Sequence, residues 1–519
     1  MDHSACYGDL RIYKRNIMLA GFSCLTKKLG VCGALSAAWT LAPLVNGATL
    51  APLSTFGGGD GWRAPFEVLP GDAAGTDSLE AGFYSYLGNT LTNTAVNGGN
   101  LERGMAYNPT TGNLIVVSRS IAGNGIRILN GTTGVDVGAL NQGSGIISGG
   151  TFTTNMVGVA DDGAIYVGNL TVSSGSSAFN IYRWANESAT EPTLAYSGPV
   201  LAGARVGDSL DVFGSGAETR IAVGYGNSPA VAGNNGFGLL TTVDGSTFTA
   251  SSIAIAGNPP EPGDFRLGIT FTDADTIIGK QGSATVGQEQ FARQVDVSGT
   301  TGTLALSIGS DGASLRPLDF ATVDGRPLLA MVEATSSTSA IARSRLFVYD
   351  QTNPAGTVAE RKIAEGSNLP INDPELGPNQ FPNGNGTGSV KFGAITGNSV
   401  VVYAMSTNNG IQAFTLTLDA ATADDADFNS DGIVDGSDFL IWQRGFGLSA
   451  QPDNSTGDAD GDGNVNDADL TVWEGQFGTA PAAASVGAVP EPGTIALAAV
   501  GLACTALRRR MVLASRMIR

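Results

Sequence analysis

Between residues 49 and 420 the sequence is a long series of short apolar or alternating runs, and each run ends at a turn sequence such as Asn-Gly or Asp-Gly. No stretch of this region repeats apolar residues with the helical period of about 3.6 residues. Alternation bounded by glycine and asparagine turns is typical of short antiparallel strands. The clearest predicted strands are 113–119, 126–131, 164–170, 179–184, 219–225, 327–334, 345–350 and 399–406.

The same region also repeats on a larger scale. Units of a small-residue segment, an apolar strand and a second strand begin near Gly104, Val157, Ser209, Leu267, Pro317 and Ser389. A spacing of roughly 50 residues suits the four-stranded blades of a β-propeller. We therefore predict a mainly β protein whose ectodomain, residues 49–420, is a propeller of six or seven blades closed by N-terminal residues. The stretch from Ala106 to Gly138 is similar, at the level of the fold, to kelch-like and NHL-like propellers. A β-sandwich or β-helix is the alternative.

Composition narrows the functions that this region can have. The chain has 519 residues, a formal net charge of −19 and one histidine, His3. An acidic surface repels nucleic acid phosphates and attracts divalent cations, so we expect no nucleic acid partner. Because His3 lies near the N-terminus in a segment predicted to be removed, histidine-dependent catalysis and histidine-ligated metals are excluded. The cysteines also lie in terminal segments, so no disulfide framework is expected: Cys6, Cys24, Cys32 and Cys504.

Residues 1–48 are predicted to be a signal peptide. Lys27 and Lys28 precede an apolar run from Leu29 to Val45, and small residues follow it at 46–48. A basic segment, an apolar segment and small residues at the cut are the three parts of a secretory signal. A retained membrane anchor is the alternative, but the run contains Pro43 and barely reaches spanning length.

The C-terminal segment, residues 489–510, has three consecutive parts. These are Val-Pro-Glu-Pro at 489–492, a mostly apolar stretch at 495–507 and three arginines at 508–510. This arrangement resembles the PEP-CTERM sorting signal. The resemblance implies export, transient membrane contact through the tail, processing by an exosortase, and a cell-surface or extracellular destination. A plain single-span anchor is the alternative, and residues 481–488 are interpreted as a linker.

Two acidic loops stand in register, 31 residues apart. The first is DFNSDGIVDGSD at 427–438 and the second is DADGDGNVNDAD at 458–469. Each is followed by an apolar stretch that contains a tryptophan, Trp442 or Trp473. The match identifies an internal duplication.

Both loops carry oxygen ligands in the order that calcium requires. Calcium takes about six to eight oxygens, from side chains at loop positions 1, 3 and 5, a carbonyl at 7, a water-mediated group at 9 and an acid at 12. We therefore predict two Ca²⁺ ions. In the first loop the ligands would be Asp427, Asn429, Asp431, the Ile433 carbonyl, Asp435 through water, and Asp438. In the second they would be Asp458, Asp460, Asp462, the Asn464 carbonyl, Asn466 through water, and Asp469. Val434 and Val465 are expected to point inward.

The final acid of each loop is aspartate, and a helix is expected after each loop but not before it. With the tandem spacing, these features of residues 424–480 resemble a type I dockerin. The resemblance implies a small α-helical module that folds on binding calcium, and a cohesin-like docking partner. Loop positions 10 and 11, often a Ser-Thr pair in cellulosomal dockerins, are here Gly436-Ser437 and Asp467-Ala468.

Two functions remain open for the ectodomain. We favour a non-catalytic, exported calcium-binding protein whose ectodomain binds a glycan or a surface protein. The alternative is a carbohydrate-active enzyme, a glycoside hydrolase or polysaccharide lyase, in polysaccharide catabolism. Its candidate groups are Arg205 with Asp208 and Asp211, Asp161 with Asp162, and Asp264 with Arg266, and each has a simpler structural interpretation, such as the turn sequence at Asp161-Asp162. Tyr182 and Trp184 are interpreted as a half-buried strand face and not as a sugar platform.

Overall fold

The computed structural model describes most of the chain between Gly47 and Gly478. The described ranges are 47–65, 67–73, 87, 101–119, 125–226, 236–256, 265–280, 291–312, 314–334, 345–366, 383–419, 425–449, 451, 453–461 and 463–478. The predicted signal peptide, apart from Gly47 and Ala48, the linker and the C-terminal sorting segment lie outside these ranges. Within them, no helix has the length and apolar character needed to cross a bilayer.

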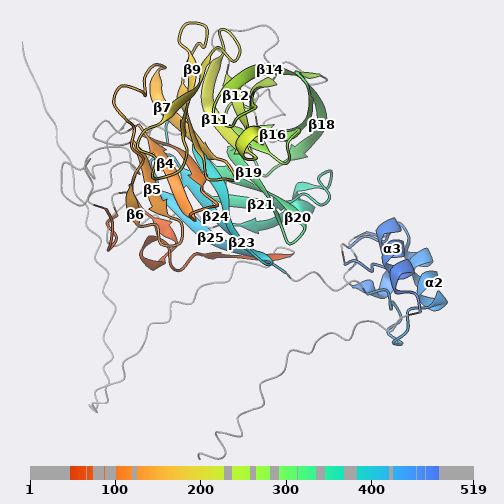
Figure 1. Cartoon of the computed structure of the whole chain (residues 1–519). Coiled ribbons are helices and arrows are strands. Elements are labelled where there is room, and N and C mark those ends of the chain that lie inside the picture. Colours follow the sequence, from red (N-terminus) through yellow and green to blue (C-terminus); the bar gives the residue numbers. More distant parts are fainter. Residues whose placement is uncertain are drawn as a thin grey trace, which may run out of the picture. The chain divides into compact units, whose positions relative to one another are not determined.

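Short antiparallel strands build the larger part of the structure (Figure 1). The first sheet holds β3 (Glu102–Tyr107), β4 (Asn113–Ser118), β5 (Ile126–Asn130) and β6 (Asp136–Ala139), and the second holds β7 (Phe152–Val159), β8 (Ile165–Leu170), β9 (Phe179–Trp184) and β10 (Thr193–Gly198). An eight-stranded sheet holds β11 (Arg205–Phe213), β12 (Arg220–Gly226), β13 (Gly236–Thr242), β14 (Phe248–Ala256), β15 (Gly268–Phe271), β16 (Thr276–Lys280), β17 (Phe291–Ser298) and β18 (Thr301–Gly309).

Two further sheets complete the strand-rich region. One holds β19 (Leu315–Val323), β20 (Arg326–Glu333), β21 (Leu346–Asp350) and β22 (Lys362–Glu365), with the short helix α1 (Val358–Arg361) before its last strand. The other holds β23 (Gly388–Thr396), β24 (Ser399–Ser406), β25 (Ile411–Leu418), β1 (Ala48–Pro52) and β2 (Trp62–Arg63). The eight strands predicted from alternation are β4, β5, β8, β9, β12, β20, β21 and β24, each within one residue at either end, so that prediction is confirmed.

The sheets have a propeller-like arrangement. The first strand of each four-strand series contacts the first strand of the next, in the closed order β3, β7, β11, β15, β19, β23 and back to β3. The six predicted unit starts fall within these strands or, for Leu267, one residue before β15. The larger repeat was therefore located correctly from the sequence.

Glycines in the first strands permit this close approach of neighbouring sheets. A Cβ atom on Gly104 of β3 would lie 2.8 Å from the Cα atom of Met156 in β7. At Gly268 of β15 it would lie 1.9 Å from the carbonyl oxygen of Arg316 in β19. Both distances are shorter than a side chain tolerates, which explains why glycine stands at these two positions.

An N-terminal strand closes the ring. Strand β1 pairs antiparallel with β25, and Leu50 lies opposite Leu416. Pairing of N-terminal residues with the last sheet was predicted and is confirmed. The strand begins at Ala48, the last residue of the predicted signal peptide, which lies opposite Leu418.

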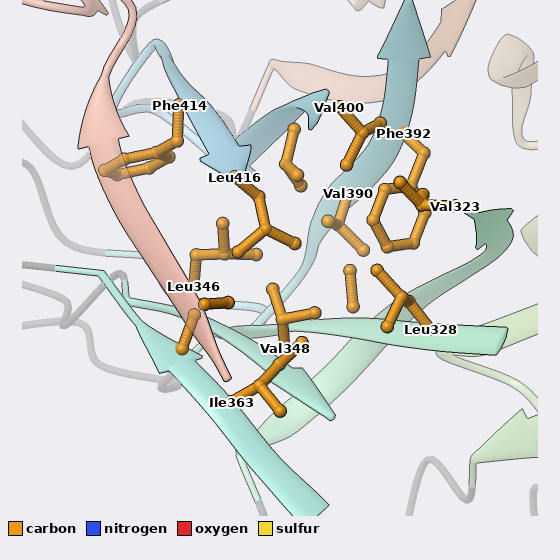
Figure 2. Close-up of a cluster of buried hydrophobic side chains, with 14 of the residues drawn as sticks. Val323, Leu328, Leu346, Val348, Ile363, Val390, Phe392, Val400, Phe414 and Leu416 are labelled. Carbon is orange, nitrogen blue, oxygen red and sulfur yellow. The ribbon is translucent and has the colours of Figure 1, made fainter. Parts of the chain in front are cut away.

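The apolar core lies between neighbouring sheets. Figure 2 shows one cluster in which Leu328 and Val348, from the β19–β22 sheet, face Val390 and Leu416 from the sheet that contains β1. Leu50 of the closing strand packs against the same cluster. The N-terminal strand is therefore held both by backbone pairing and by side-chain burial.

Truncation of a side chain in this core cluster should lower the stability of the fold. Leu416→Ala is expected to lower the free energy of unfolding by about 2–5 kcal/mol, because Leu416 is fully buried and the change leaves a cavity. Leu194→Ala is the matched control, because Leu194 is 54% exposed on β10 and its replacement should change stability by no more than about 0.5 kcal/mol. Denaturant unfolding followed by circular dichroism checks both values, and equal effects would contradict the assignment.

Candidate metal centre

The twin acidic loops each lead directly into a helix. Helices α2 (Gly436–Gly445) and α3 (Asp467–Gln476) begin at equivalent positions of the duplication. Asp435 caps the first helix and Asn466 caps the second, and in each case the acid three residues later, Asp438 or Asp469, accepts from the backbone N–H of the capping residue. These reciprocal hydrogen bonds form a capping box. They fix the position-12 carboxylates of both loops.

The second loop brings three of the predicted ligands together. The carboxylate oxygens of Asp458, Asp460 and Asp469 lie within 4.8 Å of one another. Asp469 is fully buried and accepts hydrogen bonds from the amides of Ala459 and Asn466, both at 2.7 Å. Three carboxylates at this separation can surround one hard divalent cation. The predicted ligand Asp462 lies outside the described residues.

In the first loop, backbone amides also donate hydrogen bonds to the first and last acids. Asp427 accepts hydrogen bonds from the amides of Asp431 (3.0 Å) and Gly432 (2.8 Å). Asp438, fully buried, accepts from the amides of Asn429 (3.2 Å) and Asp435 (2.8 Å). Position 3 is an amide in this loop and a carboxylate in the second, whereas position 9 is a carboxylate here and an amide there.

The remaining predicted ligands lie on the same two loops and organise the backbone. The side chains of Asn429 and Asp431 accept from amides two residues further on, at 2.8 and 3.0 Å. Those of Asp435 and Asn466 accept from helix amides, each at 2.7 Å. The predicted carbonyl ligands follow at Ile433, which is exposed, and at Asn464, which pairs with Ser449 in an isolated bridge.

Each helix is bonded to the loop of the other half. The indole of Trp442 donates to the carbonyl of Asn466 at 2.8 Å, and the indole of Trp473 donates to the carbonyl of Asp435 at 2.9 Å. Val434 and Val465 are buried in the core between the halves, as predicted. Because each loop supports the opposite helix, an ion that orders one loop also stabilises the other.

Position 6 of each loop requires a backbone conformation that favours glycine. Gly432 has φ +88° and Gly463 has φ +82°. Gly432→Ala is expected to cost about 1–2 kcal/mol of module stability in calcium, because alanine is strained at positive φ. Gly436→Ala, four residues later at the start of α2, meets no atom within 4 Å and should be neutral or slightly stabilising. Thermal loss of the helical circular dichroism signal compares the two, and an equal loss would argue against a formed loop.

The structure groups the candidate catalytic residues of the ectodomain differently from the sequence, and it separates Asp208 from Asp211. Arg205 and Arg266 both bind Asp208, whereas Asp211 binds Lys391 instead. Asp161 and Asp162 lie in the turn after β7, where Asp162 accepts from the amide of Ala164 at 3.1 Å. Asp264 lies outside the described residues.

The two aromatic candidates are core residues. Tyr182 and Trp184 are fully buried in one apolar cluster. The Trp184 indole donates to the carbonyl of Asn141 at 2.6 Å, and the Tyr182 hydroxyl donates to that of Ser148 at 2.5 Å. Neither ring is available as a sugar platform, and the predicted half-buried face is in fact fully buried because both rings pack in the core between two sheets.

Sequence reasoning missed a buried ionic network in the strand ring. The ammonium of Lys391 lies 2.8 Å from an oxygen of Asp211 and 2.6 Å from one of Asp319. The carboxylates also accept from the amides of Phe271 (3.0 Å) and Phe392 (2.8 Å). The signal available in the sequence was a charged residue beside apolar neighbours in each of three strands, as in Leu-Asp-Val, Leu-Asp-Phe and Val-Lys-Phe.

Comparison with known proteins assigns the C-terminal segment. Residues 488–510 match the PEP-CTERM protein-sorting motif. The PEP-CTERM motif implies export, processing by an exosortase and sorting to the cell surface. No curated protein matches the chain significantly.

Several solved structures are similar to the chain at low identity. A DUF4623 family protein from Bacteroides eggerthii is 16% identical with a TM-score of 0.45, covering 68% of this chain and 78% of that one. A gluconolactonase from Xanthomonas campestris is 13% identical with a TM-score of 0.36, covering 62% and 86%. Regucalcin from Agrobacterium tumefaciens, described as a calcium-binding protein, is 13% identical with a TM-score of 0.35, covering 64% and 94%.

Proposed function

We propose that this chain is an exported cell-surface protein with a non-catalytic, ligand-binding propeller and a dockerin-like module that folds around two calcium ions. The observation that carries the proposal is the pair of equivalent loops in residues 425–478, each with buried acids at its first and last positions. Buried carboxylates need a compensating cation or hydrogen bonds. Oxygen ligands in this order select calcium, because magnesium prefers a rigid octahedron and keeps its waters.

A six-bladed propeller is the arrangement that we infer for the ectodomain. The eight-stranded sheet divides into β11–β14 and β15–β18, since among the described strands backbone hydrogen bonds join the two halves only through the parallel pair β14 and β18. With the other four sheets this gives six units, and six first strands form the closed ring. The cohesin-like docking partner and the removal of residues 1–48 and of the C-terminal segment belong to the same proposal.

The ion pairs of the carboxylates in β11 and β19 support a binding role over catalysis. Lys391 holds Asp211 and Asp319 together, and Arg205 and Arg266 hold Asp208. A glycosidase pair needs one protonated acid and one free carboxylate flanking the substrate. Two acids that share one ammonium do not supply the free carboxylate.

One observation favours the enzymatic alternative, a carbohydrate-active enzyme. Asp161, Asp211 and Asp319, from three different units, line a cavity of about 230 Å³ together with Lys391. Burial, opposed by Lys391 and reinforced by Asp211, raises the pKa of Asp319 to about 6, a value suited to a general acid.

A paired screen of the mature chain tests the two roles. A glycan array is expected to give a bound ligand, and hydrolase and lyase assays on the bound glycans should give no product. Product formation that is lost in Asp319→Asn but kept in the exposed-turn variant Asp324→Asn would establish the enzyme and overturn the non-catalytic proposal.

A further inference from the structure

The first strands of the ring all run in the same direction. Residues from several of these strands line one small cavity and therefore lie at the same height along the ring, among them Met105, Met156, Leu210 and Leu318. Residues slightly later in the same strands line a second cavity, among them Tyr107, Val159, Phe213 and Phe320. Residues that come before the lining of the first cavity in each strand therefore lie together, at the end of the ring where these strands begin.

Arginines gather at this end. Arg103 lies in β3, Arg205 in β11 and Arg316 in β19, while Arg119 follows β4 and Arg266 precedes β15. Their contacts cross from unit to unit: Arg119 donates to Asn155 of β7, and Arg103 donates to Thr387, before β23, at 2.5 Å. We call these five residues the arginine cluster.

The cluster carries far more positive than negative charge. Asp208 accepts from Arg205 (Nη2, 2.8 Å) and Arg266 (Nε, 2.8 Å) and so neutralises at most one of them. Arg103, Arg119 and Arg316 form no ion pair within the part of the chain that the structure describes. Glu102 does not compensate, because it is fully buried beside the backbone of residues 408–410, and burial raises its pKa.

Several donors of the cluster lack a partner. The Nε atoms of Arg103 and Arg119 are buried without a hydrogen-bond acceptor, and the side chain of Arg316 makes no hydrogen bond to any described residue. Buried unpaired donors are costly. Burial, reinforced by neighbouring arginines, lowers the pKa of all three groups, yet guanidinium keeps its proton in proteins. Loss of a proton therefore does not relieve the repulsion, whereas a bound anion would.

Lys280 adds a sixth cationic group beside the cluster. Its ammonium is buried and donates to the Ser310 hydroxyl at 2.8 Å and to the Gly312 carbonyl at 3.2 Å, both neutral acceptors. Burial, reinforced by Arg316, lowers its pKa to about 7. A bound anion would favour the protonated form of this lysine as well.

We propose that the arginine cluster binds a ligand that carries two or more oxyanion groups, of the carboxylate, sulfate or phosphate class. The planar fork of guanidinium matches such groups in a bidentate manner. Arg205 and Arg266 remain 25% and 31% exposed, so a ligand can reach the cluster from solvent. The inference rests on the proposed binding role of the ectodomain and names its ligand class.

Calorimetry on the mature chain, with citrate, pyrophosphate, an oligogalacturonate and neutral maltose as probes, tests the site. At least one of the three anions is expected to bind, more weakly as salt rises, and maltose should not bind. A preference for the oligogalacturonate would indicate an acidic polysaccharide, and a preference for citrate or pyrophosphate a free anion. Absence of binding by all three anions would overturn the inference.

Matched arginine variants locate the site. Arg316→Gln is expected to weaken anion binding by about tenfold or more, the range for a charged hydrogen bond. The fold should survive because this side chain makes no hydrogen bond to the part of the chain that the structure describes. Arg220→Gln is the control, because Arg220 pairs with Asp275 and lies opposite Phe213, at the far end of β11 from Arg205. Equal affinity in both variants would overturn the inference. If Arg316→Gln does not fold, Arg119→Gln takes its place in the comparison.

Failure of the anion-binding inference is distinguishable from failure of the proposed function. Lost anion binding with intact calcium uptake and another glycan still bound would reject only the arginine site. Turnover of a bound anion would reject the non-catalytic role and leave the site in place.

Discussion

Removal of calcium from the mature chain with EGTA is expected to unfold residues 425–478 and leave the propeller-like sheets folded. Asp427, Asp438, Asp458 and Asp469 are all buried, and three of the second-loop carboxylates lie within 4.8 Å of one another. Without a cation, their mutual repulsion and desolvation oppose folding. In such a module the free energy of metal binding becomes free energy of folding.

The module is too small to be stable through its core alone. Its two helices have ten residues each, shorter than the roughly 12–15 residues at which isolated helices become marginally stable. Each bound ion should contribute about 2.7 kcal/mol when calcium is present at 100 times its dissociation constant. The helical circular dichroism signal and the fluorescence of Trp442 and Trp473 should fall with EGTA and recover with Ca²⁺, but not with equal Mg²⁺.

Two aspartates of α3 provide a matched pair for this prediction. Asp469→Asn removes a buried charge that the loop directs toward the ion, and we expect calcium affinity to fall by at least about tenfold. Asp467→Asn makes the same chemical change two residues away on an exposed side chain and should have little effect. A helical signal indifferent to EGTA, or equal affinities in the two variants, would refute calcium-dependent folding.

The features predicted correctly from sequence are those encoded locally. Alternation identified eight strands because each strand buries one face within a few residues. The unit spacing located the first strands because a four-stranded unit recurs about every 50 residues. The two acidic loops are also encoded locally, since each spans twelve residues, and calcium binding by them stays a prediction. Val434 could be placed inward because its neighbours in the loop are ligands.

The ionic features of the ring could not be predicted in this way. The sequence grouped Asp208 and Asp211 with Arg205, yet the pairing of β11 with β12 shifts register between Val206 and Leu210. Asp208 therefore joins the arginine cluster, while Asp211 reaches Lys391, which is 180 residues away. Only the closure of the ring brings such residues together, and closure is a property of the whole chain.

Lys391→Met is expected to destabilise the propeller by about 3–5 kcal/mol, the usual cost of leaving a buried charge without its partner. The ammonium joins β23 to β11 and β19, and the Thr270 hydroxyl of β15 donates to Asp211 at 3.0 Å. The substitution would leave two carboxylates buried side by side. Lys362→Met is the control, because Lys362 pairs with Asp311 and Glu365 near the surface and should contribute at most about 1 kcal/mol.

The cost of Lys391→Met should depend on pH in a defined direction. Burial already raises the pKa of Asp319 to about 6, against about 3.9 in an unfolded chain. Without Lys391, which lowers this pKa, it must rise further. A carboxyl whose pKa is raised by folding stabilises the native state below the unfolded pKa, and this contribution is lost as pH rises through the folded value. Lys391→Met should therefore be less destabilising near pH 4 than near pH 8 in denaturant titrations. A cost independent of pH would show that Lys391 acts only through packing.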